Sequence, residues 1–326
     1  MLRLAHPLRE GARHFKVQDV AGRGGRRGMQ EDGARRRRLR ELLADRRAVP
    51  VPGAADALAA RIIEELGFAA VYASGAGITN SRLALPDLGF LGLAELESAV
   101  RAMRGACELP LLVDADTGFG NALNVYETVR RLERAGADAV QIEDQLWPKR
   151  CGHFTGKAVI PPEEMEERIR AARAARCDPD LLIVARTDAR AVFGFEEAIA
   201  RARRYRAAGA DLLFLEAPES EAELAEIPRR LPDVPLMVNM VIGGRTPILP
   251  RERFVAMGYA LLLYANAALQ GAIRGMMRTL GVLRERGMLE EDPELLAPFA
   301  ERQKLVRKPF FDALAQRFAV PPERGA

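Results

Sequence analysis

The chain has 326 residues, of which 48% are apolar and 29% are charged, enough to bury the core of one large domain. No run of about 18 uncharged apolar residues occurs, which argues against a membrane span and predicts a soluble protein. Three cysteines, Cys107, Cys151 and Cys177, are too few and odd in number for a disulfide framework. They predict a reducing compartment, and we expect the cytoplasm.

The net charge of +4 is unevenly distributed. Residues 1–40 contain twelve Arg or Lys and four Asp or Glu, so they carry +8 and the rest of the chain carries −4. Because 22–28 and 35–38 lack apolar periodicity, residues 1–38 are predicted to form a basic, disordered arm. A solvated extension, or a start codon misassigned ahead of Met29, is the simplest interpretation. A nucleic-acid arm or a targeting peptide is the alternative.

From residue 39 onward, short apolar segments alternate with segments of helical periodicity. Strands are predicted at 49–51, 69–73, 109–114, 139–143, 181–186, 211–216, 234–239 and 259–264. Helices are predicted at 54–66, 124–135, 162–176, 196–208 and from about 220. This alternation implies parallel pairing, and eight such units close into a (β/α)8 TIM barrel, placed at 39–290. A doubly wound sheet is the competing architecture.

Polar residues stand at or just after the carboxyl ends of successive predicted strands. They are Ser74, Asp114 and Asp116, Glu143, Arg186 and Asp188, Glu216, and Asn239. Carboxyl strand ends form the catalytic face of a barrel, so this register favours the barrel and predicts an active site there. For Asp188 and Ser220, a turn or helix N-cap is the simpler interpretation.

Three of these residues predict a metal site. Asp114, Asp116 and Glu143 are the hard oxygen ligands that Mg²⁺ prefers, and a few carboxylates with waters and substrate satisfy that ion. Small residues at 75–77 let backbone N–H groups approach a substrate carboxylate, and Arg186 suits a bidentate grip on a second one. Gly75 and Gly77 also match part of a dinucleotide fingerprint, but Asn80 stands at the third glycine, so that interpretation has little support.

The adjacent loop carries the sequence Lys-Arg-Cys-Gly-His at 149–153. Positive neighbours favour ionisation of a thiol, so Cys151 is predicted to move protons. A buried, inert thiol is the alternative. Cys107 and Cys177 each end a predicted helix beside apolar or turn residues, and a structural role is expected for both.

Several segments together resemble a known family. They are 72–75, 85–89, 114–120, 142–145, 149–153, 185–189 and 239–240. In this order and spacing they resemble the isocitrate lyase and phosphoenolpyruvate mutase superfamily, from about residue 39 to about residue 284. The resemblance implies a TIM barrel whose last barrel helix is swapped with a neighbour, dimers that pair into a homotetramer, Mg²⁺, and a 2-oxo or 2-hydroxy dicarboxylate substrate. It also implies that Asp116 binds the metal directly, whereas Asp114 and Glu143 act largely through waters.

Two loops distinguish branches of this superfamily. The 149–153 loop is similar to that of the carbon–carbon lyases, including 2-methylisocitrate lyase and 2,3-dimethylmalate lyase. Trp147-Pro148 looks more like the carboxyphosphonoenolpyruvate mutases and a plant oxaloacetate-cleaving branch. The segment 239–247 resembles the dimethylmalate lyase and carboxyphosphonoenolpyruvate mutase side, which favours a dicarboxylate over a tricarboxylate.

We therefore expect a Mg²⁺-dependent carbon–carbon lyase that cleaves a 2-alkylmalate or 2-methylisocitrate-type substrate to pyruvate or another 2-oxo acid and a carboxylic acid. Cys151 would protonate the enolate carbon of the departing acid, with Arg150 and His153 setting its pKa. The predicted catalytic set also includes Asp87, and the predicted substrate-binding set comprises Ser74, Gly75, Ala76, Gly152, Arg186, Glu216 and Asn239. Alternatives are a carboxyphosphonoenolpyruvate- or phosphoenolpyruvate-mutase-type enzyme, an oxaloacetate-cleaving enzyme, or an inactive barrel that binds nucleic acid through the basic arm.

The C-terminal residues 291–326 are predicted to form a helical extension. An apolar stripe recurs there with roughly helical spacing, at Phe299, Leu305, Val306, Phe310, Phe311, Leu314 and Phe318. So large an apolar stripe needs a partner surface. By the resemblance, that surface belongs to a neighbouring subunit; no nucleic-acid or membrane partner is expected.

Overall fold

The computed structural model describes residues 25–152 and 156–319, with side chains from Asp32 onward. The described residues divide into two units, Glu31–Ile273 and a second that contains residues 274–319. Residues 1–24 of the predicted basic arm, and His153 of the predicted catalytic set, lie outside the described residues.

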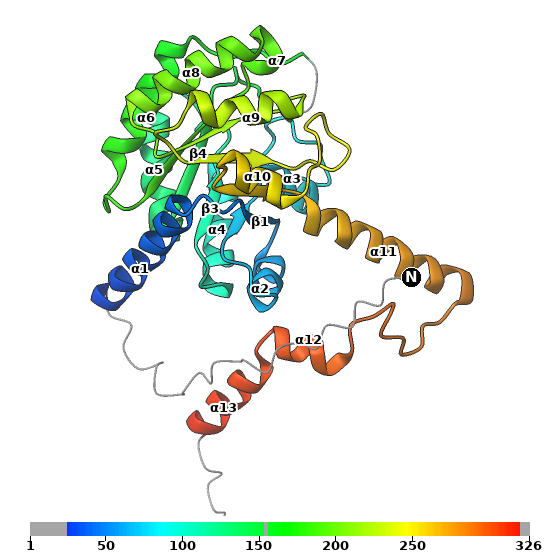
Figure 1. The fold of residues 1–326 in the computed structure, drawn as a ribbon. Coiled ribbons are helices and arrows are strands. Elements are labelled where there is room, and N and C mark those ends of the chain that lie inside the picture. The colour runs from blue at the N-terminus through cyan, green and yellow to red at the C-terminus, as the bar shows by residue number, and fades with distance from the viewer. Residues whose placement is uncertain (1–24, 153–155, 320–326) are drawn as a thin grey trace, which may run out of the picture. The chain divides into compact units, whose positions relative to one another are not determined.

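The larger unit is a closed barrel of eight parallel strands in sequential order (Figure 1). The strands are β1 (Val49–Ala54), β2 (Val71–Ala73), β3 (Leu111–Asp114), β4 (Ala139–Glu143), β5 (Leu182–Thr187), β6 (Leu212–Leu215), β7 (Leu236–Asn239) and β8 (Leu261–Tyr264). The ring closes where Val49 of β1 pairs with Leu261 of β8. The predicted TIM barrel is confirmed, and the doubly wound sheet is excluded.

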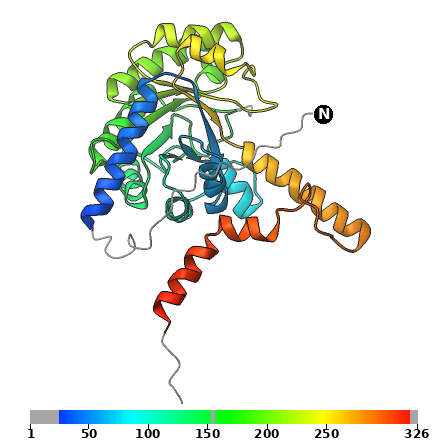
Figure 2. The ribbon, with the colours of Figure 1, turned by 60° about the horizontal axis from the view of Figure 1, so that its bottom comes forward.

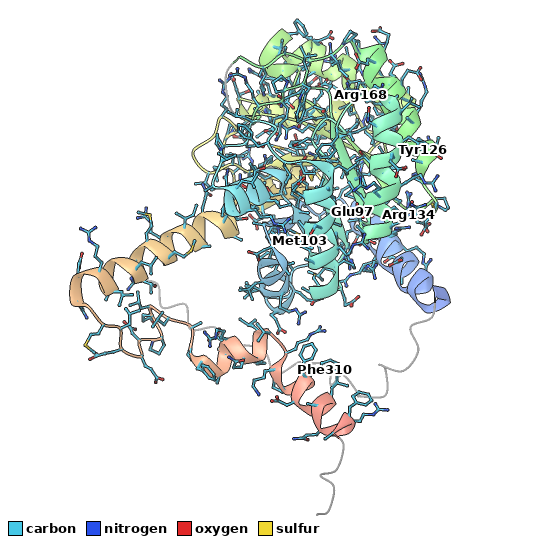
Figure 3. All side chains as sticks on the ribbon, turned by 180° about the vertical axis from the view of Figure 1, so that it is seen from behind. Glu97, Met103, Tyr126, Arg134, Arg168 and Phe310 are labelled. Atoms are coloured by element: carbon cyan, nitrogen blue, oxygen red, sulfur yellow. The ribbon has the colours of Figure 1, made fainter. Side chains whose placement is uncertain are left out.

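Helices surround the barrel. They are α2 (Ala57–Glu65), α3 (Gly75–Leu83), α4 (Leu93–Ala106), α5 (Ala122–Ala135), α6 (Pro162–Ala175), α7 (Arg190–Phe193), α8 (Phe195–Ala208), α9 (Glu221–Arg230) and α10 (Arg251–Met257). The strand–helix pattern gave no range for α3, α7 or α10, and for α4 it predicted only a helix that ends at Cys107. On α4, Met103 is fully buried, while Glu97 pairs with Arg131 of α5 at 2.6 Å, so the two helices pack side by side (Figure 3).

Local signals begin and end these helices. Ser220 caps α9 by accepting a hydrogen bond from the Glu223 N–H at 3.1 Å, which confirms its predicted N-cap role. Gly136 and Gly209 follow α5 and α8 with φ angles of 101° and 111°, a left-handed conformation that glycine adopts without a Cβ penalty. Each helix therefore ends where the next strand must begin.

Helix α1 (Gly25–Ala44) corrects the predicted domain boundary at residue 38. Leu39 and Leu43 are buried with the residues that fill the barrel interior, such as Tyr72 and Leu112. Figures 1 and 2 both show this helix, in blue, beside the barrel. Residues 25–38 are helical and not a disordered arm, because part of the helix packs on the barrel.

Two arginines of α1 explain why periodicity failed to predict it. Arg36 is buried and pairs with Glu133 at 3.0 Å and Asp178 at 2.8 Å. Arg35 is also buried, with its Nε atom 3.4 Å from the Asp138 carboxylate. The inner face of α1 is thus partly cationic, so a search for apolar periodicity does not find it.

The second unit contains α11 (Ala267–Arg286), which begins in the barrel unit, and α12 (Phe299–Leu305) and α13 (Lys308–Phe318). The predicted helical extension is therefore two short helices, with Phe310 and Phe311 in edge contact at 5.3 Å on α13 (Figure 3). None of the described residues of α11, α12 or α13 is buried. None of the helices in the described part of the chain is long and apolar enough to cross a membrane.

Candidate active site

A cavity of about 50 Å³ opens among the carboxyl ends of the strands. Its lining includes nine of the predicted site residues: Ser74, Ala76, Asp87, Asp114, Cys151, Gly152, Arg186, Glu216 and Asn239. Tyr72, Phe214, Val241, Leu263, Ala265 and Asn266 complete the wall. Residues from β2 to β8 therefore meet at one point, as the strand-end register predicted.

Ser74 lies at the end of β2 and caps α3. Its Oγ accepts a hydrogen bond from the Gly77 N–H at 3.1 Å and donates to Asn266 Oδ1 at 3.3 Å. The Gly77 N–H is therefore already hydrogen-bonded within the protein and is not available to a substrate carboxylate. A Cβ added to Gly75 would lie 3.3 Å from Asp114 Oδ2, so the missing side chain leaves room at the acidic group.

The three predicted metal-binding carboxylates are buried on neighbouring strands. Asp114 Oδ1 accepts hydrogen bonds from Gln141 Nε2 and from the Asp116 N–H, both at 3.2 Å. Asp116 has a φ of 48°, a left-handed conformation that is uncommon for a non-glycine residue. Glu143 is 1% exposed, and its Oε1 has no hydrogen-bond partner among the described residues.

Lys149 is the cation nearest to these acids. Its Nζ lies 2.8 Å from Asp116 Oδ1 and also donates to Asp87. Burial, together with the charges of Asp114 and Asp87, raises the pKa of Asp116 to about 7, although Lys149 opposes this shift. Burial opposes the charged form of Lys149, but Asp116 and Asp87 outweigh it and raise the Lys149 pKa. The lysine therefore stays protonated beside the acids.

Arg186 binds three carboxylates. It makes a bidentate pair with Asp188 at 2.8 and 3.1 Å, and it lies 3.3 Å from Glu143 and from Glu216. Its guanidinium also lies 5.3 Å from the Phe214 ring centroid. Arg186 was predicted to bind a substrate carboxylate in a bidentate manner. Its guanidinium already binds Asp188 in that way, so it must be shared between the two carboxylates. A turn or cap was the simpler interpretation of Asp188; its carbonyl does accept from the Ala191 N–H at 3.2 Å, as in a turn, but its side chain binds Arg186 and Lys157 and caps no helix.

The described residues provide a site that fits a divalent cation with few protein ligands. They contain no group of three or more His, Cys, Asp or Glu side chains placed to enclose a metal ion. Asp114, Asp116 and Glu143 nevertheless approach one another, and burial also raises the pKa of Glu143, with Asp188 and Asp116 adding to the shift. Carboxylates outnumber cations here, so an ion bound through one carboxylate and waters would relieve their repulsion.

The cysteine loop reaches into the cavity through Cys151 and Gly152. Cys151 is half-buried, whereas Arg150 is exposed and does not line the cavity. The Arg150 backbone is held by both ends of the Gln145 amide, at 2.8 and 2.9 Å. A Cβ on Gly152 would lie 2.5 Å from Arg186 Nη2 and from Glu216 Cγ, so only glycine fits this close approach.

Several site residues were not assigned a role from sequence. Lys149 was visible in the loop motif, and Asn266 follows the last strand as the other polar residues follow theirs. Tyr72 and Phe214 are apolar strand positions, so alternation alone does not separate them from core residues. Lys157 follows the loop without any spacing signal; it is buried and pairs with Asp188 at 2.7 Å.

Comparison with known proteins agrees with this geometry. The chain is 41% identical to the 2,3-dimethylmalate lyase of Eubacterium barkeri over 269 residues, which are 82% of this chain and 93% of that protein. It is 47% identical to the 2-methylisocitrate lyase of Aeropyrum pernix over 249 residues, 76% of this chain and 80% of that protein. The solved structure of oxaloacetate acetylhydrolase with 3,3-difluorooxalacetate has a TM-score of 0.82 and 33% identity, covering 89% of this chain and 99% of that one.

A family model also matches the barrel region. The model described as phosphoenolpyruvate phosphomutase aligns with residues 39–283, which include every strand of the barrel. This range agrees with the resemblance found in the sequence motifs. The chain therefore belongs to the phosphoenolpyruvate phosphomutase family, within the isocitrate lyase and phosphoenolpyruvate mutase superfamily.

Proposed function

We propose that this protein is a Mg²⁺-dependent carbon–carbon lyase that cleaves a 2-alkylmalate to a carboxylic acid and a 2-oxo acid, which is pyruvate when the 2-alkyl group is methyl. The observation that carries the proposal is the position of Cys151, which lines the same cavity as Asp114, Arg186 and Glu216. A thiol placed over carboxylate-binding groups can protonate a carbanion that forms beside a carboxylate. The relatives named as carbon–carbon lyases support this reaction class.

The reaction needs two proton transfers. The substrate hydroxyl at C2 passes its proton to a carboxylate among the cavity residues, the C2–C3 bond breaks, and C2 becomes the ketone of the 2-oxo acid. The bonding electrons move to C3, which forms the enolate of the departing acid, and Cys151 donates a proton to that carbon. Asn239 lines the cavity with its side-chain oxygen buried and without a hydrogen-bond partner in the described residues, so it is placed to accept from the substrate hydroxyl.

Charge stabilisation supports the same chemistry. The enolate of a carboxylate is dianionic, so the site must neutralise charge that grows in the transition state. A Mg²⁺ ion held by Asp114, Asp116 and Glu143 would supply that neutralisation. Arg186 and Lys149 add fixed positive charge from either side of these acids.

One assay panel tests the proposal. The protein is incubated with Mg²⁺ and, separately, 2,3-dimethylmalate, 2-methylmalate and 2-methylisocitrate, and pyruvate release is followed by a coupled reaction. Turnover should be highest with a 2-alkylmalate and should disappear in excess EDTA. Asp116→Ala should lose both metal binding, measured by calorimetry, and turnover. Full turnover in EDTA would contradict the metal requirement, and no pyruvate from any of the three acids would contradict the lyase.

The rival within the fold is an oxaloacetate-cleaving enzyme. The similarity to the oxaloacetate acetylhydrolase structure supports this rival, and a carboxyphosphonoenolpyruvate- or phosphoenolpyruvate-mutase-type enzyme is the other alternative. Oxaloacetate is therefore added to the panel with oxalate and acetate as the measured products. Oxalate release faster than any pyruvate release would favour this rival.

Two further expectations belong to the proposal. The free cysteines Cys107, Cys151 and Cys177 support a reducing compartment, for which we propose the cytoplasm. Nucleic-acid binding through the basic arm is disfavoured at Arg35 and Arg36, because both side chains are buried in ion pairs with barrel residues.

A further inference from the structure

Lys157 has a side chain that is only 2% exposed and that binds two parts of the site. Its Nζ donates to the backbone carbonyl of Gly152 and to Asp188 Oδ1, the latter at 2.7 Å. A buried ammonium group is costly unless its hydrogen bonds are satisfied. Both acceptors belong to the active site, so this lysine joins the cysteine loop to the end of β5.

Asp188, the second acceptor of Lys157, is itself held rigidly. Its carboxylate holds Arg186 in a bidentate pair, and its backbone N–H donates to Asp144 Oδ1 at 2.9 Å. Asp144 in turn accepts hydrogen bonds from Thr187 at 2.7 Å and Tyr205 at 2.8 Å. The second acceptor of Lys157 is therefore fixed by buried groups of the barrel wall.

Gly152 connects the Lys157 contact to the catalytic cysteine. It approaches Arg186 and Glu216 too closely for any side chain, and it is bonded directly to Cys151. A hydrogen bond to the Gly152 carbonyl thus sets how deeply the preceding residue enters the cavity. Lys149, on the other side of Cys151, is tied separately to Asp87 and Asp116.

We propose that Lys157 is a positioning residue, which anchors the Cys151–Gly152 segment to Asp188 and so places the thiol over the bound substrate. It does not touch the reacting atoms and acts through Gly152 and Asp188. Its removal should release Cys151 while leaving the metal-binding acids and Arg186 in place. The kinetic part of this inference rests on the proposed lyase reaction.

Three variants of the full-length protein test the role. Lys157→Met keeps the stem without the charge, Lys157→Gln keeps one donor, and Lys157→Arg keeps the charge. The first readout is alkylation by iodoacetamide without substrate, followed by the mass of the peptides that contain Cys151 and buried Cys107. We expect Lys157→Met to alkylate at Cys151 about tenfold faster, with Cys107 still protected, because only the loop opens locally.

Electrostatics alone predicts the opposite sign. Loss of a nearby positive charge lowers the thiolate fraction and slows alkylation, so acceleration reports access and not pKa. The second readout is steady-state kinetics: kcat should fall about tenfold or more while KM changes about threefold or less, since the thiol is misplaced but the binding groups remain. Lys157→Arg should restore much of kcat. Arg170→Met, which removes an exposed pair on α6, is the matched control and should behave as wild type.

Each outcome decides the inference. Faster alkylation of Cys151 alone supports it, whereas an unchanged rate overturns it. If Lys157→Met and Lys157→Gln both accelerate the alkylation of Cys107 as much as that of Cys151, the protein is generally unfolded. That result would overturn a positioning role. The alkylation needs no substrate, so an inactive wild-type protein would contradict the proposed reaction without affecting this test.

Discussion

Cys151 is the residue on which the proposed chemistry depends most directly. Its neighbour Gly152 lies against Arg186 and Glu216, and Asp114 shares the cavity with it. The described structure does not place the exposed Arg150 side chain in that cavity. Access and position of the thiol, set by the backbone of its loop, therefore matter more than its sequence neighbours suggest.

Cys151→Ser should separate proton transfer from binding. A serine hydroxyl is a far weaker acid, so kcat should fall about 10²- to 10⁴-fold, while KM should stay within about a few-fold because the carboxylate-binding groups remain. Steady-state kinetics with the best 2-alkylmalate measures both. Cys177→Ser, at an exposed thiol outside the cavity lining, is the control and should match wild type. Near wild-type cleavage by the Cys151 variant would remove this residue from the acid role.

Asp188 should make stability depend on acid pH. Burial opposes its ionisation, but Arg186 and Lys157 outweigh burial and lower the Asp188 pKa from 3.8 to about 2. A lowered pKa stabilises the native state above the unfolded pKa, and that contribution is lost as the pH falls from about 4 to about 2. Denaturant unfolding of wild type and Asp188→Asn at about pH 5 and about pH 2.5 should show their stability difference shrinking by about 2 kcal/mol. A constant difference would contradict the ion-pair account.

At the scale of elements, α1 is a structural part of the barrel unit. Leu39 and Leu43 fill the barrel interior, and Arg36 inserts between Glu133 and Asp178. The Arg36 guanidinium also donates to the Ala137 carbonyl at 3.2 Å. A chain shortened to start at Arg40 would leave these acids without their partner, so residues 25–39 are not expected to be dispensable.

Arg36→Met tests this role against Arg38→Met, an exposed arginine on the same helix. Breaking a buried ion pair leaves an uncompensated charge and should lower the free energy of unfolding by about 3 to 5 kcal/mol. The surface change should cost about 0.5 kcal/mol or less. Urea unfolding of both variants gives the comparison. Equal stabilities would mean that α1 does not hold the barrel through this arginine.

At the scale of the whole molecule, the second unit leaves large apolar side chains exposed. On α11, Met276, Met277 and Leu280 are 55%, 66% and 59% exposed, and on α13 Phe311 and Phe318 are 59% and 70% exposed. Exposed apolar area of this kind marks an interaction site. We propose that it is covered by further copies of this chain in a homotetramer, including a swapped α11.

Removal of residues 293–326 should therefore change the assembly. The deletion takes away the stripe on α12 and α13, so smaller oligomers or aggregates are expected in place of the full assembly. Multi-angle light scattering measures the mass, and Met277→Glu provides a full-length variant that places a charge on the exposed face of α11. An unchanged mass in both the deletion variant and Met277→Glu would contradict the proposed interface.

The sequence alone determined the barrel and much of the site. Short apolar strands alternate with helical segments and are bounded by Gly or Pro, so the eight strands and their carboxyl ends were predictable. Cavity residues such as Ser74, Asp114 and Asn239 followed from that register, because parallel strands bring their carboxyl ends to one face. The motif resemblance identified the family that the comparison confirmed.

Only the tertiary structure decided which charges meet. Arg35 and Arg36 look like a solvated basic run, yet long-range acids on three separate segments bury them. Asp188 looks like a turn residue, yet its buried carboxylate binds both Arg186 and Lys157. Local periodicity reports burial of apolar groups, whereas a buried ion pair depends on a partner that sequence distance does not reveal.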